Sequence, residues 1–337
     1  MPVFDHSGKV RRKVTMKSER MRWGRGVVGG GAAILALSVA GDVLAQVSRR
    51  DVPVVLQPQQ RFERGQDIQP IFEGWVRNDD GGYRFLFGYL NRNYAERPHV
   101  PVGENNFFSP GEQDRGQPTH FLPRTHRYQF EVDVPADFPL DGQLVWSVTQ
   151  QGSTQTAIGW LQPEWEIDVS TITSNGRTGF GRSVDEMFRN ESPRMEIEAS
   201  ATTVGVGQPV TLTARLQDDE LPSELPERSG SPLRQYPALT PPEDAPEIPD
   251  NIRQYQRPSP PRNHLAVLWV VFRGLDSGAI APDDYQEWED GMPGDGWTSG
   301  TFEATVTFDE PGSYRLRAFG SDAMLISTAD LDITVTE

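Results

Sequence analysis

Three histidines are the residues of this chain whose type and spacing come nearest to a chemical site. His99, His120 and His126 lie in one stretch that also carries several carboxylates. Converging imidazoles and carboxylates can bind a metal ion or transfer protons. However, the spacing matches no motif such as H-E-x-x-H, and Leu122-Pro123 separates the last two histidines. We therefore predict no metal site and no catalytic residue, and a hydrolase or metal-dependent enzyme at these histidines is the alternative.

The segment 91–121, which contains two of these histidines, is predicted to be one long loop. Its prolines and glycines forbid a long strand or helix, whereas Phe107, Phe108 and Phe121 are apolar enough to hold it in place. Ordered loops of this length are often functional. We predict that polar side chains of the loop bind a ligand, and these are Asn91, Arg92, Asn93, Asp114, Arg115 and His120. The alternative is that Asp114 and Arg115 satisfy the backbone of the loop itself.

Two further groups of residues are typical of binding sites, and each has a simpler interpretation. The loop Asp283–Asp295 is rich in carboxylates, which calcium prefers, but it lacks the spacing of an EF-hand loop. An alternating aromatic row could stack on carbohydrate if one face were exposed, and it consists of Trp75, Tyr83, Phe85, Phe87 and Tyr89. We expect core packing for the row and a solvated acidic loop, and the sequence leaves calcium binding at that loop open.

The N-terminus predicts export. A basic segment over 9–25 precedes an apolar run from Val27 to Gly41, and Val43 and Ala45 occupy the −3 and −1 positions of a cleavage point. This pattern predicts a secretory signal peptide over 1–45. The apolar run is shorter than the roughly 20 residues that a membrane-spanning helix needs. Cleavage is therefore expected, and an uncleaved N-terminal anchor is the alternative.

The composition after residue 45 excludes several chemistries and partners. No lysine or cysteine remains there, which excludes Schiff-base formation, thiol catalysis, disulfides and thiolate zinc sites. The 24 basic and 45 acidic residues that remain give a net charge of −21. Nucleic acid and anionic lipid both require a basic surface, so neither is an expected partner. We predict no cofactor, no membrane span after cleavage, and a protein or polysaccharide partner at the cell envelope.

Strand patterns recur after the predicted signal peptide, and helix patterns are nearly absent. The first predicted strands are 69–77, 83–91, 128–134, 144–149 and 154–161. In the strand 128–134, Tyr128 is predicted to face inward and Gln129 outward. The last hairpin is predicted to bury Leu144, Trp146, Val148, Ile158 and Trp160. This organisation predicts an immunoglobulin-like or fibronectin-like β-sandwich over 46–169 with the long 91–121 loop.

A second β-sandwich is predicted over 195–337, after a Gly/Ser/Thr-rich linker at 170–194 with one short helix at 183–189. Its predicted strands are 195–199, 210–216, 265–272, 301–308, 314–319 and 331–335. The eleven prolines of 221–263 cannot lie in a sheet ladder, so this segment is predicted to be an insertion outside the sheets. The predicted fold class is all-β, with two antiparallel immunoglobulin-like sandwiches in tandem.

The second predicted sandwich resembles PKD-like immunoglobulin-fold domains. VGQPVTLTA at 206–214, followed by DDELP at 218–222, is similar to the opening of that family. Trp269 stands where the family has a core tryptophan, and PGSYRLRA at 311–318 is similar to a later strand. The resemblance implies a spacer or adhesion-type module of exported bacterial proteins, with no catalytic residues. Independently, the turn before Tyr314 predicts the tyrosine corner of such sandwiches.

These patterns together predict an exported, acidic, non-enzymatic binding or structural protein in the periplasm, secreted or at the cell surface. Recognition is assigned to the N-terminal sandwich through the 91–121 loop, and the PKD-like sandwich is predicted to be a spacer. A hydrolase or metal-dependent accessory enzyme using His99, His120 or His126 is the first alternative. A subunit of a larger envelope assembly is the second, and the sequence does not define the oligomeric state.

Overall fold

The computed structural model describes residues 62–176, 183–222, 264–287 and 299–337. All of them belong to one compact unit that begins at Gln60. The predicted signal peptide over 1–45, most of the proline-rich segment 221–263 and residues 288–295 of the acidic loop lie outside the described residues. In the described part of the chain, no helix is long and apolar enough to cross a membrane.

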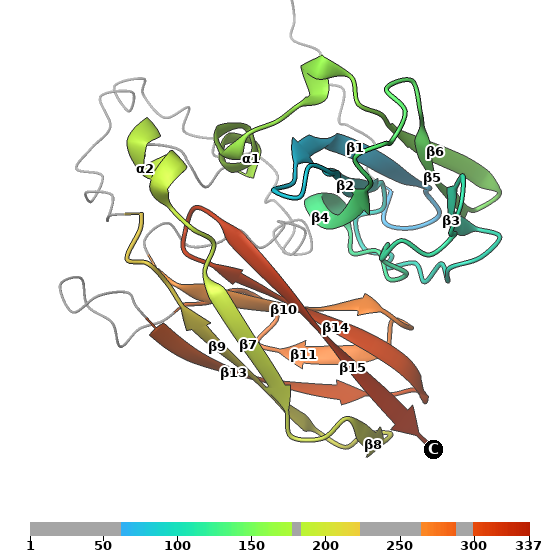
Figure 1. Cartoon of the computed structure of the whole chain (residues 1–337). Coiled ribbons are helices and arrows are strands. Elements are labelled where there is room, and N and C mark those ends of the chain that lie inside the picture. Colours follow the sequence, from blue (N-terminus) through green and yellow to red (C-terminus); the bar gives the residue numbers. More distant parts are fainter. Residues whose placement is uncertain (1–61, 177–182, 223–263, 288–298) are drawn as a thin grey trace, which may run out of the picture. The chain divides into compact units, whose positions relative to one another are not determined.

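Strands form most of the described secondary structure, which confirms the all-β prediction (Figure 1). The strands are β1 Ile68–Arg77, β2 Tyr83–Asn91, β3 Asn106–Ser109, β4 Arg124–Val134, β5 Leu144–Gln150, β6 Ser153–Gly159, β7 Arg194–Ala199, β8 Thr203–Gly205, β9 Val210–Gln217, β10 Ala266–Arg273, β11 Gly278–Ala281, β12 Gln286–Glu287, β13 Ser299–Phe308, β14 Gly312–Ser321 and β15 Ile326–Thr336. The helical elements are η1 Pro163–Trp165, α1 Val169–Gly176 and α2 Val184–Arg189.

The C-terminal strands β7 to β15 form two sheets with the strand order of an immunoglobulin domain. One sheet has the order β11-β13-β9-β7, and the other has the order β12-β10-β14-β15-β8 (Figure 1). The pairing of β15 with β8 is parallel, and the other pairings in these two sheets are antiparallel. Taken from β7 to β11, the first sheet follows the A-B-E-D order of an immunoglobulin domain. In the second sheet, β10, β14 and β15 follow the C-F-G order. The immunoglobulin-like fold predicted for this part of the chain is therefore confirmed.

Two details predicted for this sandwich are present. Trp269 on β10 is buried between the sheets. The Tyr314 hydroxyl, near the start of β14, donates to the carbonyl oxygen of Glu310 at 2.9 Å and lies 2.5 Å from Ser277 Oγ. This arrangement is the tyrosine corner that fixes the turn before β14.

Strand β10 is buried along both faces, which explains its continuous apolar sequence. Trp269 faces the core between the two C-terminal sheets. On the opposite face, Leu268 and Val270 pack against Leu122 of the N-terminal part. At the end of the strand, Phe272 belongs to the core of the N-terminal sheets. One strand therefore contributes to three hydrophobic clusters.

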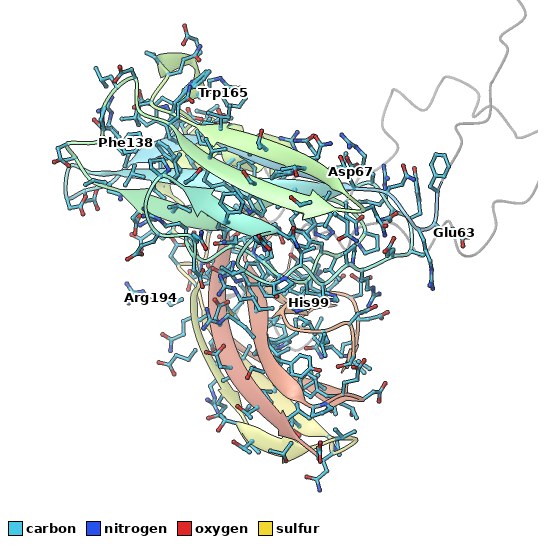
Figure 2. All side chains as sticks on the ribbon, turned by 90° about the vertical axis from the view of Figure 1, so that its right-hand side faces the viewer. Glu63, Asp67, His99, Phe138, Trp165 and Arg194 are labelled. Carbon is cyan, nitrogen blue, oxygen red and sulfur yellow. The ribbon has the colours of Figure 1, made fainter. Side chains whose placement is uncertain are left out.

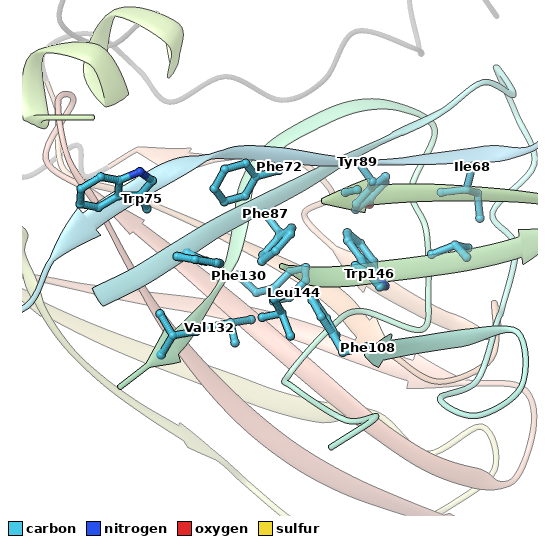
Figure 3. Close-up of a cluster of buried hydrophobic side chains, with 14 of the residues drawn as sticks. Ile68, Phe72, Trp75, Phe87, Tyr89, Phe108, Phe130, Val132, Leu144 and Trp146 are labelled. Atoms are coloured by element: carbon cyan, nitrogen blue, oxygen red, sulfur yellow. The ribbon is translucent and has the colours of Figure 1, made fainter. Parts of the chain in front are cut away.

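The N-terminal strands form two three-stranded sheets, β1-β2-β4 and β3-β5-β6. Figure 3 shows how aromatic side chains from both sheets, including Phe72, Phe87, Phe108 and Trp146, meet between them. Phe87 contacts Phe108 edge-to-face with ring centroids 5.3 Å apart, and Trp146 stacks on Phe108 at 5.9 Å. The row from Trp75 to Tyr89 lies in this core, with Tyr83 partly buried against it. Core packing is confirmed for the row, and the carbohydrate-stacking interpretation is wrong.

Two predicted orientations in these sheets are wrong. Ile158 on β6 is 41% exposed, because Ala157 and Gly159 face the core instead and Trp160 is half-buried. The Phe85 ring explains the choice of face, since it lies 2.7 Å from where a Cβ of Gly159 would be. Leu144, Trp146 and Val148 on the neighbouring strand β5 are buried as predicted.

The second error concerns β4. The pairing of β2 with β4 shifts register between Phe87 and Tyr89, and Tyr128 takes a positive φ of 51° at this irregularity. As a result, Tyr128 is half-buried, whereas Gln129, predicted to face outward, is buried. The carbonyl oxygen of Gln129 accepts a hydrogen bond of 2.6 Å from Arg317 Nη1 of β14.

The segment 170–194, predicted to be a linker, contains most of α1 and all of α2. The short helix expected at 183–189 is present, and it begins with a capping box between Ser183 and Glu186. The division of the chain into a domain at 46–169, a linker and a domain at 195–337 stays a prediction.

Candidate functional site

The 91–121 loop is built around buried amide side chains. Asn106 is 0% exposed, and its Nδ2 donates to the carbonyl oxygens of Val100 at 2.9 Å and Pro118 at 2.8 Å. Its Oδ1 accepts from Trp146 Nε1 at 2.9 Å. Asn106 also begins the short strand β3, which pairs with β5. One amide thus joins two distant points of the loop to the aromatic core, and Phe108 and Phe121 are fully buried as anchors.

The predicted ligand-binding residues Asn91 and Asn93 have the same structural role at the start of the loop. Asn91 is fully buried, and its Nδ2 donates to the carbonyl oxygens of Glu96 at 2.8 Å and Phe121 at 3.0 Å. Its Oδ1 accepts from the backbone and side-chain nitrogens of Asn93. Arg92 between them forms an ion pair with Asp67.

Asp114 lies at the exposed tip of the loop, and the half-buried Arg115 follows it. Asp114 forms a bidentate ion pair with Arg273 of β10, with nitrogen–oxygen distances of 2.7 and 3.0 Å. The Arg273 guanidinium lowers the pKa of Asp114. Asp114 Oδ1 also accepts from the Gly116 backbone nitrogen, and Arg115 Nε donates to the Glu112 carbonyl oxygen. Both side chains therefore satisfy the backbone of the loop, as the simpler interpretation requires.

His120 is buried where the loop meets β10. It pairs with His99 across an isolated bridge, and the backbone nitrogens of Thr119 and His120 both donate to the Phe272 carbonyl oxygen, at 3.1 and 3.3 Å. Burial lowers the pKa of His120 to about 3, so the imidazole is neutral at physiological pH. Its Nε2 lies 3.8 Å from Asp276 Oδ1.

The structure separates the predicted site residues into three groups. Asn91, Arg92 and Asn93 interact with residues 66–69, Asp114 and Arg115 lie at the loop tip, and His120 is buried beside His99. The third histidine, His126, instead stacks on Tyr89 with ring centroids 4.9 Å apart. Ligand binding by these residues stays a prediction, and all six contact other parts of the chain.

Two open grooves lie elsewhere, over the N-terminal sheets. One, of about 370 Å³, is lined by Gln69, Pro70, Ile71, Phe72, Thr156, Ala157, Ile158, Trp160 and Trp165. The second, of about 480 Å³, shares Trp160 and includes the exposed Leu140. Figure 2 shows Trp165 beside the N-terminal strands. Neither groove contains a histidine, and the described residues hold no cluster of three or more His, Cys, Asp or Glu side chains that could bind a metal.

Strand order and the tyrosine corner thus define an all-β chain with an immunoglobulin-type sandwich. No protein family matches the sequence, and no curated protein matches it. Among solved structures, the chain is similar to the D00-D0 domain of intimin, with a TM-score of 0.24 and 9% identity over 80% of this chain and 100% of that one. It is also similar to domains 4 and 5 of the S-layer protein SbsC, with a TM-score of 0.19 and 11% identity over 81% and 98%. The Escherichia coli adhesin FdeC gives a TM-score of 0.21 and 12% identity over 80% and 64%.

Proposed function

We propose that this chain is an exported, non-enzymatic binding or structural protein of the bacterial envelope. The C-terminal PKD-like sandwich acts as a spacer, and the N-terminal sheets carry recognition. The observation that best supports this proposal is the construction of the 91–121 loop. Its base is fixed by Asn91 and Asn106 and by Phe272 of β10, whereas its tip at 110–114 is exposed.

A fixed base with an exposed tip suits recognition, because polar groups on a rigid scaffold bind with little loss of conformational freedom. The tip is acidic and polar, with the sequence Pro110-Gly111-Glu112-Gln113-Asp114. The net charge of −21 after residue 45 favours a neutral or basic protein surface, or a neutral polysaccharide, over an acidic partner. Of the histidines named for the hydrolase alternative, His120 and His126 are both buried, so neither offers an accessible base.

The export part of the proposal is tested by fractionating cells of the native host and sequencing the N-terminus of the recovered chain. We expect the chain in the periplasmic or surface fraction with an N-terminus near residue 46. Recovery of the uncleaved chain from the cytoplasm contradicts export.

The recognition part is tested by a photo-crosslinking residue placed at Glu112, in cells that express the whole chain. The matched control carries the same residue at Asp141, which is also exposed. A cross-linked partner at Glu112 and none at Asp141 supports recognition by the tip. Equal labelling at both positions, or at neither, contradicts it.

A further inference from the structure

A cluster of buried oxygen atoms lies where three elements of the C-terminal part converge. Asp218 directly follows β9, Asp322 directly follows β14, and Asn190 is the C-cap residue of α2. Asn190 Nδ2 donates to Asp322 Oδ2 at 2.7 Å, and the charges of Asp218 and Asp322 are close enough to repel each other. Asn190 therefore contacts Asp322, and Asp218 lies near Asp322.

The hydrogen bonds of this cluster are incomplete. Asn190 is only 8% exposed, and its Oδ1 is buried without a hydrogen-bond partner among the described residues. Both carboxylate oxygens of Asp218 are likewise buried without a hydrogen-bond partner among the described residues. Buried polar atoms are almost always satisfied, so these oxygen atoms require a partner.

The charge of the cluster is also uncompensated. Asp322 is 0% exposed, and its oxygens accept from the backbone nitrogens of Met324 and Leu325 and from Asn190. In the described part of the chain, no arginine or histidine forms an ion pair with Asp218 or Asp322. The C-terminal end of α2 adds partial negative charge. Buried carboxylates of this kind are normally paired or coordinate a metal ion.

We propose that Asp218, Asp322 and Asn190 bind a calcium ion. Two carboxylates and an amide oxygen supply only hard oxygen ligands and neutralise a divalent charge, which suits Ca²⁺. Backbone carbonyls and water complete the six to eight ligands that this ion takes. The described residues hold no cluster of three or more His, Cys, Asp or Glu side chains that could bind a metal. The proposed site has a different composition, with two carboxylates and one amide.

The bound ion fastens α2 to the C-terminal sandwich. Asn190 belongs to the segment that leads into β7, whereas the two aspartates belong to the sandwich. The next backbone nitrogen, that of Glu191, already donates to Asp219 Oδ2 at 3.2 Å. Calcium is therefore expected to order the entry to the C-terminal sandwich, with a Kd of about 10⁻⁴–10⁻³ M, as in extracellular modules.

The test is calorimetric titration of the whole chain with CaCl₂ after treatment with a chelator, together with the melting temperature at each calcium concentration. We expect one site and a melting temperature that rises with calcium. Asp218→Asn and Asp322→Asn are each expected to weaken binding by at least about tenfold, since both remove a charged ligand. Asp218→Asn removes a repelled buried charge, so it is not expected to lower the melting temperature without calcium.

Two further variants separate this site from other carboxylates. Asp309→Asn, an exposed aspartate of the same sandwich, is the matched charge control and is expected to bind normally. The double variant Asp283→Asn/Asp284→Asn tests the acidic loop. Absence of both a binding heat and a melting shift in the unmodified chain overturns the proposal. So does loss of binding in the loop variant with normal binding by Asp218→Asn.

Discussion

Asn106→Ala is the most informative single substitution in the 91–121 loop. The change deletes an amide that makes three hydrogen bonds in a fully buried position. Two backbone carbonyl oxygens, those of Val100 and Pro118, lose their donor, and the indole nitrogen of Trp146 loses its acceptor. A small side chain cannot replace any of these bonds.

The expected loss in the free energy of unfolding follows from the number of buried polar groups left without a hydrogen-bond partner. A buried donor or acceptor without a partner costs about 1–3 kcal/mol, so three of them at the lower half of that range cost about 3–6 kcal/mol. Native domains are stable by only about 5–15 kcal/mol, so this substitution removes a large part of the free energy of unfolding. Water entering the space left by the amide would reduce the cost toward the lower value.

Urea unfolding followed by tryptophan fluorescence measures this cost. Asn105→Ala is the matched control, because Asn105 is exposed and its substitution is expected to cost less than about 0.5 kcal/mol. In a Trp146→Phe background, Asn106→Ala is expected to cost at least about 1 kcal/mol less, since the indole donor is already absent. Equal stability of Asn106→Ala and Asn105→Ala refutes the role assigned to this amide.

Three other predictions concern stability. Tyr314→Phe removes the hydroxyl that donates to Glu310 and is expected to lower the free energy of unfolding by about 1–2 kcal/mol in the same urea assay. Gly88→Ala is expected to lower the melting temperature sharply, because its Cβ would lie 2.4 Å from the His126 backbone oxygen, whereas Gly205→Ala meets nothing closer than 3.6 Å and serves as the control. His120 makes the free energy of unfolding depend on pH. Its imidazole is protonated below about pH 6.5 in the unfolded chain but only near pH 3 in the folded chain, so its contribution to stability falls as the pH drops from about 6.5. His120→Gln is expected to reduce that fall in melts between pH 7 and pH 4, and an unchanged slope contradicts it.

Most strands could be predicted from the sequence, because their apolar residues alternate or run continuously. The predicted strand 83–91 coincides with β2, and the predicted strands 210–216 and 144–149 lie within one residue of β9 and β5. The strands that were missed, β3, β8, β11 and β12, have four residues or fewer. Segments this short carry too few alternating positions for a pattern, and pairing with a neighbour determines them.

The inward face of a strand was less predictable than the strand itself. In β6, apolar residues occupy both faces, so Ile158 and Ala157 are equally good candidates for the core. The Phe85 ring decides between them, because it requires the space that a glycine leaves. In β4, the register shift opposite Gly88 moves Gln129 to a buried position, and no pattern in the neighbouring residues predicts this shift.

The 91–121 loop was predicted to be held by three phenylalanines, of which Phe108 and Phe121 are buried as predicted and Phe107 is half-buried. Two of its asparagines, Asn91 and Asn93, were assigned to a ligand because exposed and buried amides look alike in a sequence. The partners of the buried asparagines in this loop are carbonyl groups at distant positions, such as Pro118 for Asn106 and Phe121 for Asn91, and only the fold brings these together. The calcium site was missed for the same reason, since Asn190, Asp218 and Asp322 are far apart along the chain.

The parallel pairing of β8 with β15 has a mechanical consequence. Val206 N donates to Thr336 O at 3.0 Å, and Thr334 N donates to Thr202 O at 2.9 Å, so the short strand is attached to the last strand at both of its ends. Because the two strands run in the same direction, a pull toward the N-terminus on one and toward the C-terminus on the other slides them past each other. The bonds then carry the load together and must break together. In a protein that bridges two attachment points, this three-residue strand lies in the path of the force.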